Sequence, residues 1–75
     1  MESIRIGNKE KSVRVKAYVL EFYFCAMGLE MFDAKHQAEK ELNILVGIYG
    51  PENVTGDDVA RAVLNRVLES ERFQD

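Results

Sequence analysis

Apolar residues follow one another almost without a break between Ser12 and Met31. Read at helical spacing, one stripe recurs at alternating steps of four and three residues. Its members are Val13, Ala17, Leu20, Phe24, Met27 and Met31. Such a stripe is the seam that one helix presents to another, so it predicts a helix near residues 10–27. A second apolar stripe beside it contains Tyr18 and Phe22, which indicates that this helix is covered from two directions.

The beginning of the chain also carries the alternation that is typical of strands. The alternating residues are Ile4, Arg5 and Ile6 before a break at Gly7 and Asn8, and Val13, Arg14, Val15 and Lys16 after it. Taken alone, this pattern resembles a short hairpin. A strand from Ser12 to Phe24 would be unusually long, however, and the alternation fails after Lys16. We therefore expect a helix here, with a hairpin followed by two helices as the alternative.

A second helix is predicted near residues 32–49, with Asp33 as its capping residue. One clean apolar stripe runs along it and consists of Ala34, Ala38, Leu42, Leu45 and Tyr49. The last six residues, 44–49, are apolar on all sides, and we expect them to be buried on more than one side. Gly50 and Pro51 end the helix, because proline cannot continue the hydrogen-bond ladder.

The third helix is predicted near residues 57–72. Thr55 followed three residues later by Asp58 approximates a capping box at its start. Its wide apolar face consists of Val59, Ala60, Val63, Leu64, Val67 and Leu68. Gly28 suits a left-handed end for the first helix. The sequence thus predicts an all-α fold: a single compact three-helix domain over residues 1–75, with a short irregular or extended N-terminal arm. The alternative is α+β.

Charge is distributed unevenly along the chain, which has a formal net charge of −3. Residues 1–16 hold five basic side chains against two acidic ones, whereas residues 29–75 hold ten acidic side chains against five basic ones. The excess of acidic side chains in residues 29–75 argues against nucleic-acid binding. The basic N-terminal arm, residues 1–16, keeps nucleic-acid binding as an alternative. The candidate nucleic-acid contacts are Arg5, Lys9, Lys11, Arg14 and Lys16.

The residue types that carry chemistry are few, because the chain has one cysteine and one histidine. Cys25 lies in an apolar segment with no basic group within a helical turn, so we expect a packed and unreactive thiol. His36 is three residues from both Asp33 and Glu39, a spacing used in metal bundles, but those sites draw on several helices. We therefore predict no catalytic residue, no metal and no cofactor, and a protein that is not an enzyme.

The N-terminal residues lack the apolar core of a signal peptide. The apolar run after Ser12 is interrupted by Arg14, Lys16 and Glu21, so it is too short to span a membrane. From these features we expect a cytoplasmic protein that makes no contact with a membrane.

A helix with two apolar stripes, together with the apolar end of the second helix, leaves more apolar surface than three short helices cover. We therefore expect a homodimer, with Tyr18, Phe22 and Phe24 as candidate interface residues. The predicted function is that of a small adaptor, regulator or inhibitor that binds another protein, whose identity stays open. In the alternative, the order of strand, helix, Gly28-Leu29 and helix resembles ribbon-helix-helix repressors. That resemblance implies a DNA-binding regulator that uses the basic arm.

Overall fold

The computed structural model describes residues 2–7 and 10–70. In chain order, the elements are β1 (Ser3–Gly7), β2 (Ser12–Lys16), α1 (Ala17–Met27), α2 (Met31–Tyr49), the short 3-10 helix η1 (Pro51–Asn53) and α3 (Gly56–Glu69). The described chain is thus mostly helical, with three helices and one two-stranded antiparallel sheet. It fits the α+β alternative better than the all-α prediction.

The N-terminal hairpin is where the helical prediction for residues 10–27 is wrong. β1 and β2 pair antiparallel from Ser3 opposite Lys16 to Gly7 opposite Ser12. Ile6 and Val15 point into the core and are fully buried. Val13 and Val15 suit the apolar face of a strand, and Val13 also fits a helical seam, so local spacing does not separate the two structures. Pairing with β1 decides in favour of the strand.

The first helix begins where the second strand ends, with no residue between them. The backbone N–H of Ala17 donates to the carbonyl oxygen of Glu2 at 3.0 Å, so the beginning of β1 is attached to this junction. The other end of α1 confirms the prediction for Gly28, which has a φ of 69° in the left-handed region. The N–H of Leu29 then donates to the carbonyl oxygen of Phe24 at 2.8 Å, and this closes the last turn.

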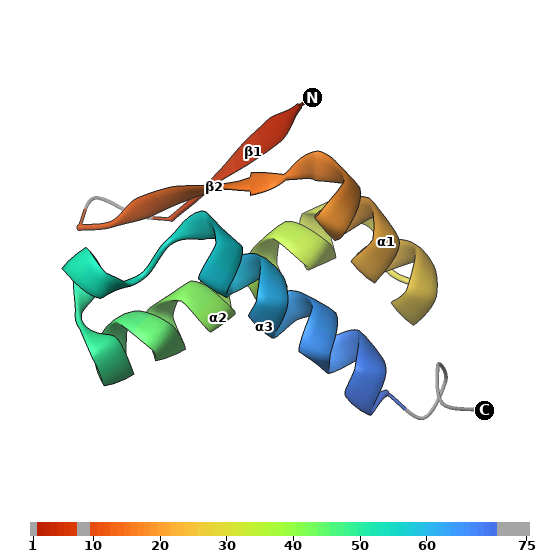
Figure 1. Ribbon diagram of the computed structural model, residues 1–75. Coiled ribbons are helices and arrows are strands. Elements are labelled where there is room, and N and C mark those ends of the chain that lie inside the picture. Colours follow the sequence, from red (N-terminus) through yellow and green to blue (C-terminus); the bar gives the residue numbers. More distant parts are fainter. Residues whose placement is uncertain (1, 8–9, 71–75) are drawn as a thin grey trace.

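The core lies between the hairpin and the three helices (Figure 1). The hairpin crosses one side of the molecule, and α2 and α3 lie on its inner face. Buried side chains from every helix and both strands meet there: Ile6, Val15, Val19, Leu20, Tyr23, Ala34, Ala38, Leu42, Val54, Val59, Val63 and Val67. α3 begins so close to β2 that a Cβ atom on Gly56 would overlap the carbonyl oxygen of Arg14. Only glycine allows this approach.

The helix starts differ slightly from the prediction. α2 is capped by Glu30 instead of Asp33, and the Asp33 carboxylate accepts from the Glu30 backbone N–H at 3.3 Å. At α3, the predicted capping box is present. The Asp58 N–H donates to Oγ1 of Thr55 at 3.3 Å, and the Asp58 carboxylate accepts from the Thr55 N–H at 2.9 Å. Hydrogen bonds from the Thr55 backbone and side chain lower the pKa of the Asp58 carboxyl group. α3 ends at Glu69, and residues 71 and 72 of the predicted helix lie outside the described residues.

Candidate functional surfaces

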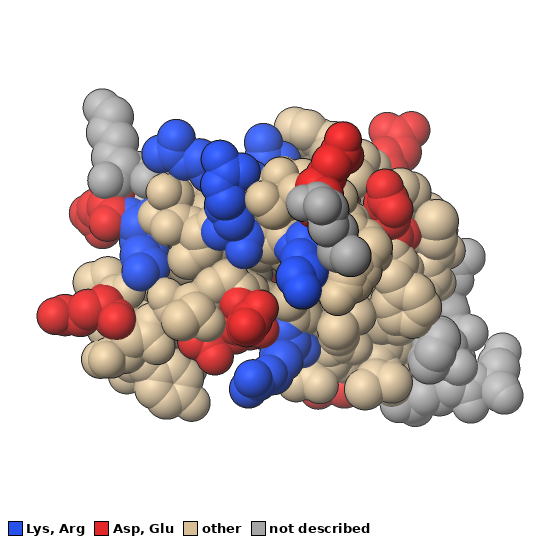
Figure 2. Space-filling view, turned by 45° about the horizontal axis from the view of Figure 1, so that its top comes forward, with Lys and Arg blue, Asp and Glu red and all other residues tan. Residues whose placement is uncertain are grey.

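The outward side of the hairpin gathers basic side chains. We call this surface the ribbon face and define it by the exposed residues Ser3, Arg5, Ser12, Arg14 and Lys16. Alternation along the strands places these residues opposite the buried Ile6 and Val15. Figure 2 turns this side of the molecule toward the reader and shows lysine and arginine side chains gathered in its upper part.

Two arginines face each other across the ribbon face, because Arg5 pairs directly with Arg14 in the strand register. Like charges in this position destabilise a sheet. The one hydrogen bond described for these guanidinium groups runs from Nη1 of Arg14 to Oγ of Ser3, at 3.2 Å. No ion pair joins Arg5, Arg14 or Lys16 to an acidic side chain within residues 2–7 and 10–70. Within that part of the chain, these three basic side chains are therefore not paired with carboxylates.

Three of the five predicted nucleic-acid contacts thus lie on one surface. Lys11 precedes β2 and is partly buried, so it is not part of the exposed ribbon face. Lys9 lies outside the described residues. Pairing of the strands, which the helical prediction did not foresee, is what brings Arg5 beside Arg14.

The second candidate surface is on α2, which changes in character along its length. In the covered segment, Met31–Leu42, the residues Ala34, Ala38 and Leu42 are buried against the core. In the bare segment, Asn43–Tyr49, only Leu45 and Val46 pack against it. The other apolar side chains of the bare segment are exposed to 49% at Ile44, 65% at Ile48 and 60% at Tyr49. The expectation that residues 44–49 are buried on more than one side is therefore wrong for a single chain.

Gly47 lies among these exposed side chains, one helical turn from Ile44 and next to Ile48. A Cβ atom built on Gly47 meets no other atom within 4 Å, so the space above it is open. A groove of about 340 Å³ adjoins the bare segment between α2 and α3. The side chains that line it are Leu45, Tyr49, Asn53, Val54, Asp58, Arg61, Ala62 and Asn65. The groove thus shares Leu45 and Tyr49 with the bare segment, while half of its lining residues are polar or charged.

The interface residues predicted from the sequence all lie on α1. Tyr18 and Phe22 are one turn apart on the outer side of the helix, and each is about half exposed. Phe24 is partly buried and packs against the core. The structure therefore brings Tyr18 and Phe22 together on one surface and places Phe24 away from it.

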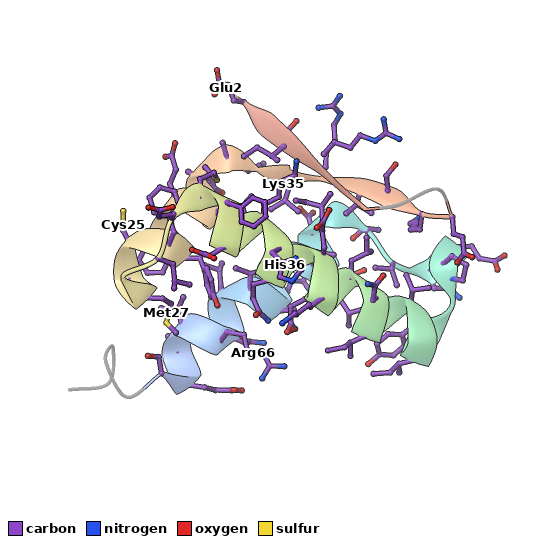
Figure 3. All side chains as sticks on the ribbon, turned by 180° about the vertical axis from the view of Figure 1, so that it is seen from behind. Glu2, Cys25, Met27, Lys35, His36 and Arg66 are labelled. Atoms are coloured by element: carbon purple, nitrogen blue, oxygen red, sulfur yellow. The ribbon has the colours of Figure 1, made fainter. Side chains whose placement is uncertain are left out.

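Glu41 is not part of the apolar stripe predicted for α2, yet its carboxylate lies inside the molecule. Glu41 is only 5% exposed, and its Oε1 accepts hydrogen bonds from Nε of Arg66 at 3.0 Å and Nε2 of Gln37 at 3.2 Å. Arg66 lies on α3 (Figure 3), and the hydrogen bond that it donates to Glu41 raises the pKa of its guanidinium group. Burial, followed by the negative charge of Glu41, raises the pKa of the Tyr23 phenol. This cluster joins all three helices and has the character of a structural contact.

The residues considered for chemistry do not come together. Cys25 is exposed and projects outward from α1, away from His36 on α2 (Figure 3), so the expectation of a packed thiol is wrong. The His36 ring stacks on Phe32, with ring centroids 6.4 Å apart. Asp33 belongs to the cap of α2. Within residues 2–7 and 10–70, no three histidine, cysteine, aspartate or glutamate side chains are grouped so that they could hold a metal ion.

Comparison of the chain with models of known families, with curated protein sequences and with solved structures gives no match. Among the described helices, none has both the length and the apolar character that crossing a membrane requires.

Proposed function

We propose that this protein is a small non-enzymatic adaptor, regulator or inhibitor, which acts through protein–protein interaction as a homodimer. The observation that carries the proposal is the bare segment of α2. Its exposed apolar side chains, Ile44, Ile48 and Tyr49, lie on a helix that the rest of the described chain covers from the inner side only. Contiguous exposed apolar surface of this kind marks interaction sites on proteins.

Gly47 supports a second α-helix as the occupant of this surface. Glycine inside a helix is less stable than alanine by roughly 0.5–1 kcal/mol, and the open space around Gly47 means that packing within the described chain does not require it. A glycine does allow another backbone to approach closely. If α2 of a second copy crosses at Gly47, isoleucines of each helix lie beside the glycine of the other.

A twofold axis through this crossing makes the contact self-complementary, as the common dimers of identical chains require. Residues 42–50 contain no charged side chain, so two copies meet there without burying an unpaired charge. The groove beside Tyr49 extends the surface available to the partner copy. Tyr18 and Phe22 on α1 form the alternative interface for the same homodimer.

Analytical ultracentrifugation of two matched variants tests the proposal. The wild-type chain of 8.6 kDa should sediment at twice its mass at micromolar concentration. Gly47→Glu should sediment as a monomer, because it places a bulky charge at the crossing point. Its helix should remain folded, since glutamate has a higher helix propensity than glycine and the site is open. Tyr18→Glu, the control on α1, should remain dimeric.

The reverse pattern, a monomeric Tyr18→Glu and a dimeric Gly47→Glu, would move the interface to α1. A wild-type chain that remains monomeric at several hundred micromolar would exclude the homodimer. Circular dichroism of each variant shows whether the fold is kept.

A further inference from the structure

We infer that the ribbon face is a binding site for duplex DNA, a site distinct from the proposed dimer surface on α2. Arg5, Arg14 and Lys16 project from the same side of a two-stranded ribbon, and no acidic residue of β1 or β2 shares it. The two helices that support the ribbon, α2 and α3, both lie on its inner side (Figure 1). The outer side is therefore open to a large ligand.

The arrangement of the arginines points to an anionic ligand. Arg5 and Arg14 stand directly opposite each other, where like charges lower the stability of the hairpin. An ordinary solvated strand surface does not require this pairing. The hydrogen bond to Ser3 holds Arg14 in a defined position over the ribbon. An anion placed over both guanidinium groups removes their repulsion and accepts hydrogen bonds from each of them.

The shape of the ribbon favours duplex DNA among polyanions. Neighbouring strands lie about 4.8 Å apart, and five residues extend over about 17 Å. The major groove of B-form DNA, about 12 Å wide, admits a two-stranded ribbon of these dimensions. From the groove, the arginine and lysine side chains of the ribbon face can contact the phosphates along its edges. The major groove of duplex RNA is too narrow for side chains to read.

The charge of the remaining chain limits the strength of binding. Residues 29–75 carry an excess of acidic side chains, which DNA repels. Binding should therefore depend on the few cations of the ribbon face and should weaken steeply with salt. With three phosphate contacts per chain, affinity is expected to fall roughly 40-fold between 50 and 200 mM salt.

Fluorescence anisotropy with a labelled 20-base-pair duplex of mixed sequence tests the inference. We expect wild-type protein to bind at 50 mM salt. The double variant Arg5→Gln/Arg14→Gln should lose at least tenfold in affinity, and the slope of log K against log salt should become about 2 units shallower. The matched control is Lys35→Gln/Lys40→Gln, which removes the same charge from exposed positions on α2 and should stay within about threefold of wild type. Thermal unfolding should show that the ribbon variant is folded, because both arginines are exposed.

Four results would overturn the inference. The first is no binding of wild-type protein to the duplex at 50 mM salt and tens of micromolar protein. The second is an equal loss in both double variants, which would assign the effect to net charge. The third is unchanged affinity in the ribbon variant. A single-stranded or duplex RNA of the same sequence that binds more tightly than the DNA would also overturn the assignment to B-form DNA. The Gly47→Glu variant has an intact ribbon face, so it should still bind the duplex even if it no longer forms a dimer. Its binding therefore distinguishes the DNA site from the dimer surface.

Discussion

The two segments of α2 present opposite kinds of surface to solvent. In the covered segment, Met31–Leu42, the outward positions are mostly charged or polar, and they include Lys35, Glu39 and Lys40. In the bare segment, Asn43–Tyr49, the outward positions carry isoleucine, glycine and tyrosine. Both segments place apolar side chains on the core. The described chain by itself therefore buries the apolar side chains of the covered segment. The bare segment has the apolar composition of a buried helix, but no part of the described chain covers its outer side.

Phe32 is the exception within the covered segment, since it is 77% exposed. Its ring stacks on His36 one turn away, and Lys35 and Glu39 surround the pair. A single exposed apolar residue among polar ones is common on protein surfaces and needs no partner. The bare segment differs because three large apolar side chains are exposed within one and a half turns.

The largest effect should come from removing apolar atoms from the covered segment, with the same change in the bare segment as the comparison. Leu42→Ala empties part of the core and should lower the free energy of unfolding by about 2–5 kcal/mol. Ile48→Ala removes an exposed side chain and should change the stability of a single chain by less than about 0.5 kcal/mol. Urea unfolding measures both values. It should be carried out at submicromolar protein concentration, where the smallest fraction of the chains is associated.

An Ile48→Ala variant as unstable as Leu42→Ala at that concentration would contradict the division of α2 into a covered and a bare segment. Repeating the unfolding at a hundred-fold higher concentration should stabilise the wild-type protein and have a smaller effect on Ile48→Ala, because a dimer gains stability from concentration.

A smaller effect is expected from the buried carboxylate of the covered segment. Glu41→Gln keeps the shape of the side chain but replaces the charged acceptor of the hydrogen bond from Arg66 with a neutral amide oxygen, so stability should fall by about 1 kcal/mol. Glu39→Gln is the control, since Glu39 lies farther out on the same helix and has no described ion pair. Equal stability of the two variants in urea would show that the contact between Glu41 and Arg66 contributes little.

The smallest effect appears only at high pH. The pKa of Tyr23 is raised above its ordinary value of 10.0, so the unfolded chain loses this proton first as the pH increases. Stability should be unaffected below about pH 10 and should decrease above it. Tyr23→Phe should show a shallower decrease in urea unfolding measured from pH 7 to pH 11. If both proteins lose stability at the same rate, another group is responsible.

The sequence predicts the elements whose signals are local. Gly28 ends α1 and the capping box of Thr55 and Asp58 begins α3, because each depends on residues that lie within one turn. The predicted apolar face of α3 is confirmed at Val59, Val63 and Val67, which are buried, but not at Leu68, which is 55% exposed. These features need no knowledge of the remaining chain.

The hairpin and the surfaces depend on contacts between distant residues. Val13 fits a helical seam as well as a strand, and pairing between β1 and β2 decides which of the two forms. The same pairing places Arg5 beside Arg14. Glu41 looks like an outward residue in the sequence, and it is buried because Arg66, 25 residues later, reaches it. Ile48 is exposed because η1 and α3 contact α2 without covering its outer side, and the spacing of apolar residues in the sequence does not reveal this.

The direct passage from β2 into α1 makes the hairpin and the first helix one mechanical unit. No loop residue separates Lys16 from Ala17. The backbone hydrogen bond from the N–H of Ala17 to the carbonyl oxygen of Glu2 holds the beginning of β1 at the same point. Rotation of the hairpin therefore turns the beginning of α1 with it, including Tyr18, which lies one residue beyond the junction. The hairpin and the beginning of α1 are already ordered before a ligand binds, so little conformational entropy is lost on binding.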